Sequence, residues 1–245
     1  MIADTWTVAW RELRGLLYVD ASLVRGLRPL LFSLAVFGVF LPLQFGRSLI
    51  ESPAAILPWI WVPFLMTTGV VADAFAGERE RHTLETLLVS RLPDDAILAG
   101  KVIAAVAYGL GFATASALVG VIVVNAASWQ GRVVFYPPAL LAALVVFGTI
   151  GSVLVAGAGA LVSLQASSVR QASQMVSVVV FAIIIVPVVL GQVLPEDWRR
   201  EIVRVLDGAD LLLIAVVLGA ILCLVDGSLL LAARRRFRRS QLVLD

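Results

Sequence analysis

The sequence predicts an all-α polytopic membrane protein with six transmembrane helices and both termini in the cytoplasm. Of its 245 residues, 60% are hydrophobic and the mean hydropathy is +0.99, whereas soluble domains are about 45–50% apolar. The charged residues, 15% of the chain, gather in short clusters between long apolar stretches. Because no internal repeat, low-complexity tract or soluble domain is apparent, we expect residues 1–245 to form a single transmembrane domain.

Residues 4–20 are expected to form an amphipathic helix. At helical spacing its apolar side carries Trp6, Trp10, Leu13 and Leu17. Arg11, Arg14 and Gly15 point away from that side. Tryptophan beside arginine suits the lipid headgroup region, so we expect an interfacial helix lying flat on the membrane; an ordinary soluble cap helix is the alternative. The tryptophans also interrupt any apolar leader core, so no cleavable signal peptide is expected.

Six apolar stretches follow and are the expected spans. They cover residues 29–45, 54–75, 97–124, 137–164, 172–194 and 209–233. All but the first reach the roughly 20 residues that a helix needs to cross a bilayer, and the first does so if it continues to about Ile50. Bends are expected at Pro42, Pro58, Pro63 and Pro187.

The basic residues give the orientation. With a cytoplasmic amino terminus, 14 of the 19 Lys and Arg residues lie inside, which fits the positive-inside rule. The five that lie outside are Arg47, Arg132, Arg199, Arg200 and Arg204. The sequence therefore places both termini and residues 77–101 in the cytosol, with the 234–239 arginine cluster at the inner leaflet.

Residues 77–101 are the only long polar interruption of the apolar sequence. In a helix Glu78, Arg81 and Glu85 would share one face, with an Arg81/Glu85 i,i+4 pair. A second face would carry Leu84, Leu87, Leu88 and Leu92. Pro93 would end this helix, and Asp94 or Asp95 would cap the next one. We expect the leucines to press into another protein; a solvated hairpin linker is the alternative.

Two stripes of small residues are expected to pack helices closely together. They are Ala105, Gly109, Ala113 and Ala117 in the third span, and Gly148, Ser152, Ala156 and Ala160 in the fourth. Between the last two spans, residues 195–208 have the spacing of a short helix on the outer surface, closed by Gly208.

Several kinds of chemistry are excluded. Cys223 and His82 are the only residues of their types, which excludes an intrachain disulfide, thiolate metal clusters and most nucleophile–histidine catalysis. Gly100-Lys101 lacks the earlier glycine and the following Ser/Thr of a phosphate loop. Asp73 and Asp226 lie in the inner parts of their spans, where a carboxylate needs a partner. We expect buried ion pairs with Arg79 or Arg234; a gating role is the alternative, and a proton relay the weakest.

Residues 77–101 also resemble the signature of the ABC-2 type transporter permease family. The resemblance is carried by Glu80, Thr83-Leu84-Glu85, Leu87-Leu88, Pro93 and Gly100-Lys101. That family typically shows an acidic pair, Gly-Thr-Leu-Glu, a leucine pair, a proline, and a Gly-Lys entering the third span. The sequence departs at His82, where the family often has glycine. Because histidine permits a continuous helix, we expect the helix to run through this position.

The resemblance implies a multi-pass permease subunit of an ABC exporter in a prokaryotic inner membrane. It would form a dimer with a second copy or a paralogue and dock separate ATP-binding-cassette ATPase subunits. ATP and Mg would be bound by those subunits, while this chain would be no enzyme and bind no cofactor, metal or nucleic acid. The coupling segment would be 77–96, and the extracellular segment 195–208 would line the exit. The residues implied in ATPase coupling are Glu78, Arg79, Glu80, Arg81, Thr83, Leu84, Glu85, Leu87 and Leu88.

Two other classes compete with this interpretation. An ion-gradient-driven secondary transporter or channel would work without an ATPase, and it predicts ionisable residues at the membrane midplane. A membrane scaffold or integral membrane enzyme is the third class, and an enzyme would need clustered catalytic groups at one face. The sequence offers little of either pattern, and it does not identify the substrate.

Overall fold

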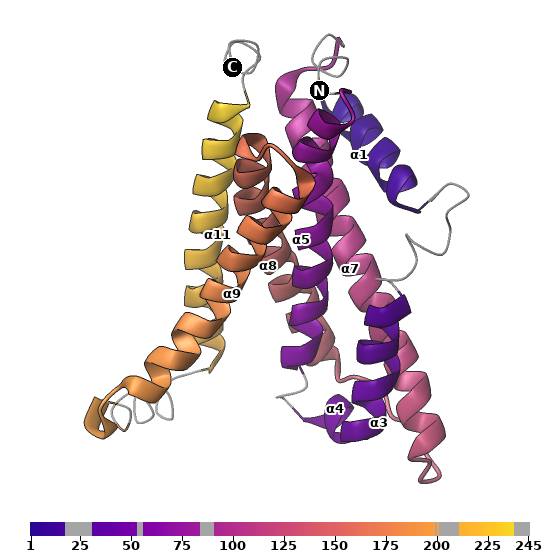
Figure 1. Ribbon diagram of the computed structural model, residues 1–245. Coiled ribbons are helices and arrows are strands. Elements are labelled where there is room, and N and C mark those ends of the chain that lie inside the picture. Colours follow the sequence, from indigo (N-terminus) through magenta and orange to yellow (C-terminus); the bar gives the residue numbers. More distant parts are fainter. Residues whose placement is uncertain (18–30, 53–55, 84–90, 199, 201–210, 238–245) are drawn as a thin grey trace.

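A computed structural model describes residues 1–17, 31–52, 56–83, 91–198, 200 and 211–237. Within these ranges every regular element is helical, which confirms the all-α class. The elements are α1 (Ile2–Leu17), η1 (Leu34–Phe40, π-helical), α3 (Leu41–Phe45), α4 (Ser48–Glu51), α5 (Ile56–Glu80), α7 (Asp94–Ala127), α8 (Pro138–Gln165), α9 (Val169–Val193) and α11 (Leu211–Arg236). Figure 1 shows the longer helices packed side by side as a bundle, with α1 alongside one end.

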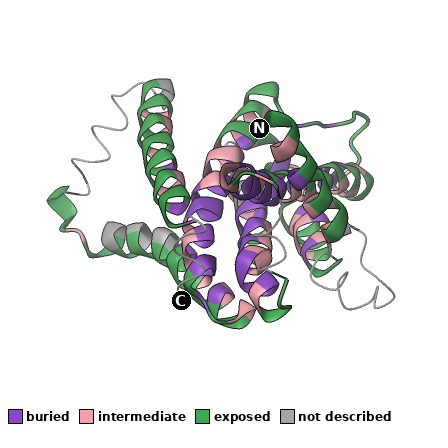
Figure 2. Cartoon of the chain, turned by 90° about the horizontal axis from the view of Figure 1, so that it is seen from above, coloured by how far each residue is buried: buried purple, intermediate pink, exposed green. Residues whose placement is uncertain are grey.

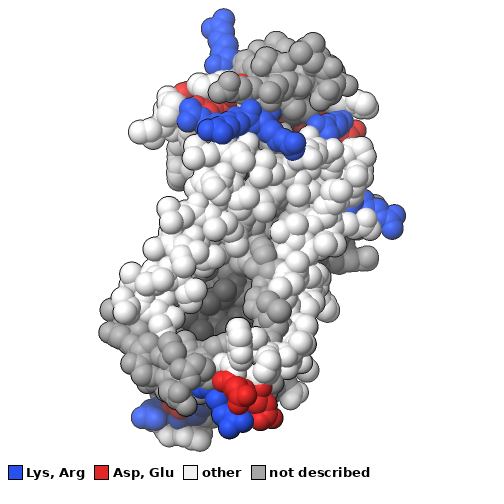
Figure 3. Space-filling model, turned by 90° about the vertical axis from the view of Figure 1, so that its left-hand side faces the viewer, with Lys and Arg blue, Asp and Glu red and all other residues white. Residues whose placement is uncertain are grey.

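Three helices in the described ranges are long and apolar enough to cross a membrane: α7, α8 and the 213–236 part of α11. α5 and α9 have 25 residues each, about 37 Å at 1.5 Å per residue, so their length alone would also suffice. Figure 3 shows charged side chains gathered at the two ends, with a broad surface of uncharged residues between them. The chain is therefore an integral membrane protein.

The first apolar stretch is not one continuous helix up to Ile50, as the sequence analysis allowed. Helical structure runs from Leu31 to Phe45, and Gly46 then takes a positive φ of 53°, a conformation open to glycine. α4 follows the break, and its Leu49 and Ile50 are buried beside Trp59 of α5. The apolar residues after Gly46 thus pack under the bundle instead of lengthening the helix.

α5 lies at the centre of the bundle and packs against α7, α8 and α9. Glycines make this possible: a Cβ on Gly109 would lie 2.5 Å from Thr67 Oγ1, and one on Gly159 would lie 2.2 Å from Val71 Cγ1. Both predicted small-residue stripes are buried. Seen from above, the buried residues face the middle of the packed helices and the outward sides are exposed (Figure 2). Close approach of backbones, as is usual for helices in lipid, explains these stripes.

α1 packs on α7 through a face that the sequence analysis did not select. Val8 and Ala9 are buried, whereas Trp6 and Trp10 are 63% and 48% exposed. The predicted helix at 4–20 therefore exists as Ile2–Leu17, with residues 18–20 outside the described ranges. Arg14 does not point away from the tryptophans, because its guanidinium lies 5.1 Å from the centre of the Trp10 ring. The amphipathic helix thus has a protein-facing side and a separate aromatic side open to the surroundings.

The described residues of the 77–101 segment lie at one end of the bundle, which we call the α5–α7 end. There α5 ends and α7 begins, and α1, the end of α8, the start of α9 and the end of α11 lie beside them (Figure 1). The amino terminus, the described parts of 77–101 and the Arg234–Arg236 cluster thus share one side. At the opposite end Arg132 pairs with Glu51 at 3.7 Å. Of the predicted outer helix at 195–208, residues 196–198 and 200 are helical, and 199 and 201–208 lie outside the described ranges.

Candidate functional site

α5 ends in a left-handed turn at His82, and the helix predicted to continue to Leu92 does not. His82 has φ 55°; its N–H donates to Arg79 O at 3.1 Å, and the Thr83 N–H donates to Glu78 O at 2.9 Å. This is the hydrogen-bond pattern of a Schellman C-cap, whose left-handed residue is usually glycine. The glycine that the family resemblance gives at this position was therefore the signal for a helix end. Residues 84–90, including Leu84, Glu85, Leu87 and Leu88, lie outside the described ranges.

Lys101, near the start of α7, is the buried centre of a cluster of charged side chains. Only 3% of its side chain is exposed, and its Nζ lies 2.9 Å from Glu78 Oε1 and 3.2 Å from Glu12 Oε1. It also donates to the backbone oxygen of Ala74 at 2.7 Å. Arg11 supplies a second cation, 3.2 Å from Glu12 and 3.9 Å from Glu78. Two carboxylates and two cations thus balance and join α1, α5 and α7.

Gly100, next to Lys101, determines how closely α1 can approach α7. A Cβ at this position would lie 2.6 Å from Val8 Cβ and 3.0 Å from the backbone oxygen of Thr5. Such distances are far inside normal contact, so only glycine allows the two backbones to come this near. Gly100 and Lys101 together hold α1 against α7. Gly100 leaves space for the α1 backbone, and Lys101 forms an ion pair with Glu12 of α1.

Arg79 and Glu80, the last two residues of α5, hold the turn between α8 and α9. Arg79 Nη1 donates to Ala166 O at 2.6 Å and Nη2 donates to Leu164 O at 2.8 Å. The Glu80 carboxylate accepts the Val169 N–H at 3.0 Å. The arginine therefore binds carbonyls left free at the end of α8, and the glutamate binds the amide that opens α9, each at the helix end whose dipole suits its charge.

Arg81 pairs with Asp73 inside its own helix. Its guanidinium donates to both carboxylate oxygens at 3.2 and 3.3 Å. Asp73 thus has a cationic partner, but it is neither Arg79 nor Arg234, and the pair is not buried, because the Arg81 and Asp73 side chains are 56% and 43% exposed. Glu85 lies outside the described ranges, so the predicted Arg81/Glu85 pair is not seen, and Arg81 is already engaged by Asp73.

α7 begins directly after Pro93, as the sequence analysis predicted, but no aspartate caps it. Pro93 itself is the N-cap residue, and the cap makes no side-chain hydrogen bond. Asp94 and Asp95 lie in the first helical turn, where carboxylates still suit the dipole. Asp95 accepts two hydrogen bonds from Arg234 of α11, at 2.6 and 2.5 Å, which ties the start of α7 to the end of α11.

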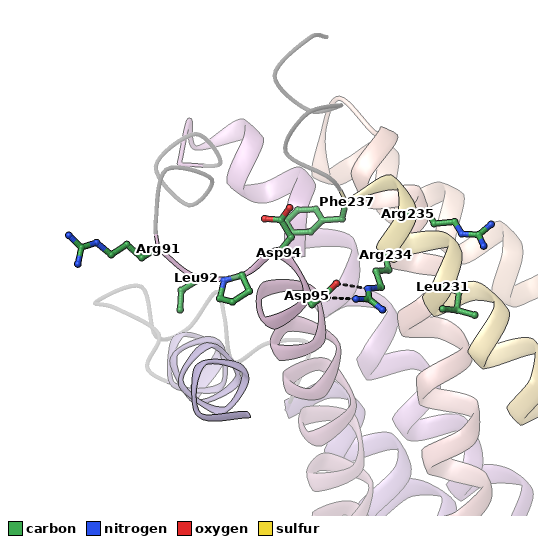
Figure 4. Close-up of a pocket in the computed structure, with 9 residues that line it drawn as sticks. Arg91, Leu92, Asp94, Asp95, Leu231, Arg234, Arg235 and Phe237 are labelled. Carbon is green, nitrogen blue, oxygen red and sulfur yellow. Dashed lines mark hydrogen bonds and ion pairs between the residues drawn. The ribbon is translucent and has the colours of Figure 1, made fainter. Parts of the chain in front are cut away.

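A pocket of about 740 Å³ opens around this ion pair. Figure 4 shows Asp95 and Arg234 bonded to each other at its edge, with Phe237 above and Leu231 below, while Arg91 and Arg235 point outward. Arg91, the first described residue after 84–90 in the 77–96 segment, lines this pocket. The pocket is thus a recess at the base of that segment.

Asp226 has none of the partners expected for it. It is buried in α11, and its Oδ1 finds no hydrogen-bond donor among the described residues. The expected ion pair with Arg234 is absent, because that arginine is bound to Asp95. Its neighbours along the same face, Leu222, Leu229 and Leu230, pack against the apolar core. Asp226 and Asp73 are therefore in different surroundings and do not form one site.

The structure brings together five of the nine predicted coupling residues, Glu78, Arg79, Glu80, Arg81 and Thr83, at the α5–α7 end. The sequence analysis did not assign Glu12 or Ser163 to this region, and it expected Asp94 or Asp95 to cap α7, not Asp95 to pair with Arg234. Ser163 Oγ donates to Ala72 O at 3.0 Å and accepts the N–H groups of Phe75 and Ala76. In the described part of the chain no three His, Cys, Asp or Glu residues converge as a metal site. The arrangement links helices.

A comparison with protein families supports the assignment that residues 77–101 indicate. The sequence profile described as "ABC-2 family transporter protein" matches residues 62–204, which is more than half of the chain and includes α7, α8, α9 and most of the charged α5–α7 end. No match was found among curated proteins. The chain belongs to the ABC-2 transporter family of membrane proteins.

Proposed function

We propose that this protein is the permease subunit of an ATP-binding-cassette transporter, which forms the translocation pathway and is driven by separate ATPase subunits. The family match supports the transporter class. The sequence has no phosphate-loop motif of its own, so ATP and Mg would be bound by the partner subunits. Within this proposal the chain is not an enzyme, and its task is to convert a movement imposed from outside into a change of the pathway.

The coupling surface in this proposal is the segment 77–96. The observation that carries it is the convergence of α1, α7, α8 and α9 on the last turn of α5, because a partner pressing there would act on four helices at once. Glu78, Arg79, Glu80 and Arg81 all bind partners inside the chain. Among the described residues, the contact with the ATPase therefore falls to the exposed His82 and Thr83. The leucines at 84, 87 and 88 would supply the apolar part of the contact.

The orientation in the membrane follows from the distribution of charge, and the other features follow from the family resemblance. Six spans with both termini in the cytoplasm would put the α5–α7 end inside, in agreement with the positive-inside rule. A prokaryotic inner membrane, export as the direction of transport, and pairing with a second copy or a paralogous permease come from the family resemblance. Segment 195–208 would then lie outside, near the exit of the pathway.

The test is to co-express the tagged chain with an ATP-binding-cassette ATPase from the same organism and to purify the two proteins together. The purified proteins are then reconstituted into lipid nanodiscs. The expected result is a stable complex whose rate of ATP hydrolysis exceeds that of the ATPase alone. Transport by the chain alone in proteoliposomes, driven by an ion gradient, would contradict the proposal and support a secondary transporter or channel.

A further inference from the structure

We infer that Arg79 and Glu80 act as a bridge that passes displacement of the coupling segment to the α8–α9 turn, rather than as contacts for the ATPase. This inference rests on the proposed function, since it assumes that a partner moves the end of α5. It assigns positioning roles to two residues that the family resemblance placed in docking.

The direction of the side chains supports the bridge. Arg79 is half-buried and binds Leu164 O in the last turn of α8 and Ala166 O, the carbonyl of the residue that follows α8. Glu80 follows it in sequence and binds the first amide of α9, at Val169. Two neighbouring residues thus hold both sides of the three-residue turn 166–168.

The packing beneath the bridge favours joint movement of α5 and the α8–α9 turn over sliding of one past the other. Ala72 and Ala76 of α5 are buried against Ala166 of the α8–α9 turn and Ala172 in the first turn of α9, and short side chains leave little room for rotamer changes. Ser163 Oγ adds three hydrogen bonds to the α5 backbone. The end of α5 and the α8–α9 turn are therefore joined by bonds and by close-packed backbone, and a shift of one must move the other.

α9 is the element on which this would act most. Its buried residues with described side chains, Ala172, Val176 and Val180, all lie in its first half. In its second half the exposed side chains include Phe181 and Val193, at 57% and 74%. The start of α9 is joined to α5 and to the end of α8, and a shift of that end changes the angle of the helix. The bridge would therefore set the inclination of α9 relative to α5 and α8.

Arg81 provides a matched control. It lies two residues after Arg79 and one after Glu80, carries the same charge as Arg79, and is bound to Asp73 of its own helix. Its removal eliminates a cation from the same turn without releasing α8 or α9. A general effect of charge or of local folding would therefore appear in Arg81→Ala as well as in the bridge variants.

The experiment uses the complex of the chain with its ATPase in nanodiscs and measures hydrogen exchange without nucleotide and with ATP and vanadate. In the wild type we expect nucleotide-dependent changes in peptides covering 77–93 and 166–176. In R79A/E80A we expect the ATPase to copurify and the change at 77–93 to persist, while the change at 166–176 is lost. Arg81→Ala should retain both changes. Should the double variant fail to fold, Arg79→Lys, which can reach only one of the two carbonyls, gives the same measurement with the charge preserved.

The outcomes separate the two proposals. A wild-type chain that does not copurify with the ATPase overturns the proposed function. A bound complex in which R79A/E80A keeps the change at 166–176, or in which the wild type never shows it, overturns the bridge alone. Loss of ATPase binding in R79A/E80A but not in Arg81→Ala also overturns the bridge, because it would return these residues to docking.

Discussion

The ammonium of Lys101 lies 2.9 Å from the carboxylate of Glu78, and both side chains are almost entirely buried. The pair joins the end of α5 to the start of α7 across the segment proposed to receive the ATPase. Glu12 brings α1 to the same lysine at 3.2 Å. The two ends of the coupling segment are thus fixed to each other and to the amphipathic helix. A partner that moves the segment meets a rigid base, as force transmission requires.

Removing the lysine should destabilise the protein strongly. Lys101→Met keeps the length of the side chain but leaves Glu78 buried without its closest cation, and breaking a buried pair in this way typically costs about 3–5 kcal/mol. We expect a clear fall in the thermal unfolding temperature of the purified protein in detergent. K101M/E78Q removes both charges and should recover part of the loss. Equal stability of Lys101→Met and wild type would contradict the buried cluster.

Filling the space at Gly100 should detach α1. A leucine there must displace Val8, since even a Cβ would lie 2.6 Å from the Val8 Cβ. We expect faster hydrogen exchange throughout residues 2–17 in Gly100→Leu, measured by mass spectrometry. Gly111→Leu is the control, because it lies in the same helix and no atom is within 4 Å of its Cβ position. Unchanged exchange of α1 in Gly100→Leu would show that the close approach is not what seats it.

Glycine at position 82 should stabilise the protein. His82 adopts φ 55°, a conformation that costs non-glycine residues about 1 kcal/mol, and His82→Gly removes that cost. A β-branched residue is less tolerant of positive φ, so His82→Val should lower stability. Thermal unfolding of the three proteins distinguishes this from a continuous helix, in which glycine would be the destabilising substitution.

Much of the fold could be predicted because apolar length and proline position are local properties. Pro93 sets the start of α7 through its own backbone restriction, and the stripe from Ala105 to Ala117 shows which side of α7 packs. The break at Gly46 was missed because hydropathy does not register a change of φ. The protein-facing side of α1 was missed for a related reason: Val8 and Ala9 are less conspicuous than the tryptophans, and burial depends on α7, far away in sequence.

The site could be predicted only as a region. Helical spacing placed the charged residues Glu78 to Arg81 at the end of a helix. It did not identify their partners, which are distant in sequence or are backbone groups. Lys101 binds Glu12, 89 residues away. Arg79 binds backbone carbonyls, which every residue possesses, so the residue types in the sequence do not identify its partners. Helical periodicity also paired Arg81 with Glu85, a pairing that holds only if the helix continues. The left-handed turn at His82 ends the helix first.

The central claim is that the 77–96 segment receives a separate ATPase, and Leu88→Glu tests it most directly. A carboxylate at an apolar contact should weaken ATPase binding by more than about tenfold, because its unpaired burial costs at least about 1.4 kcal/mol. Leu88→Met, which conserves volume, is the control. The measurement is the amount of ATPase retained per permease, together with the rate of ATP hydrolysis, in nanodiscs. We predict normal membrane insertion with loss of both in Leu88→Glu; wild-type binding and hydrolysis in that variant would contradict the account.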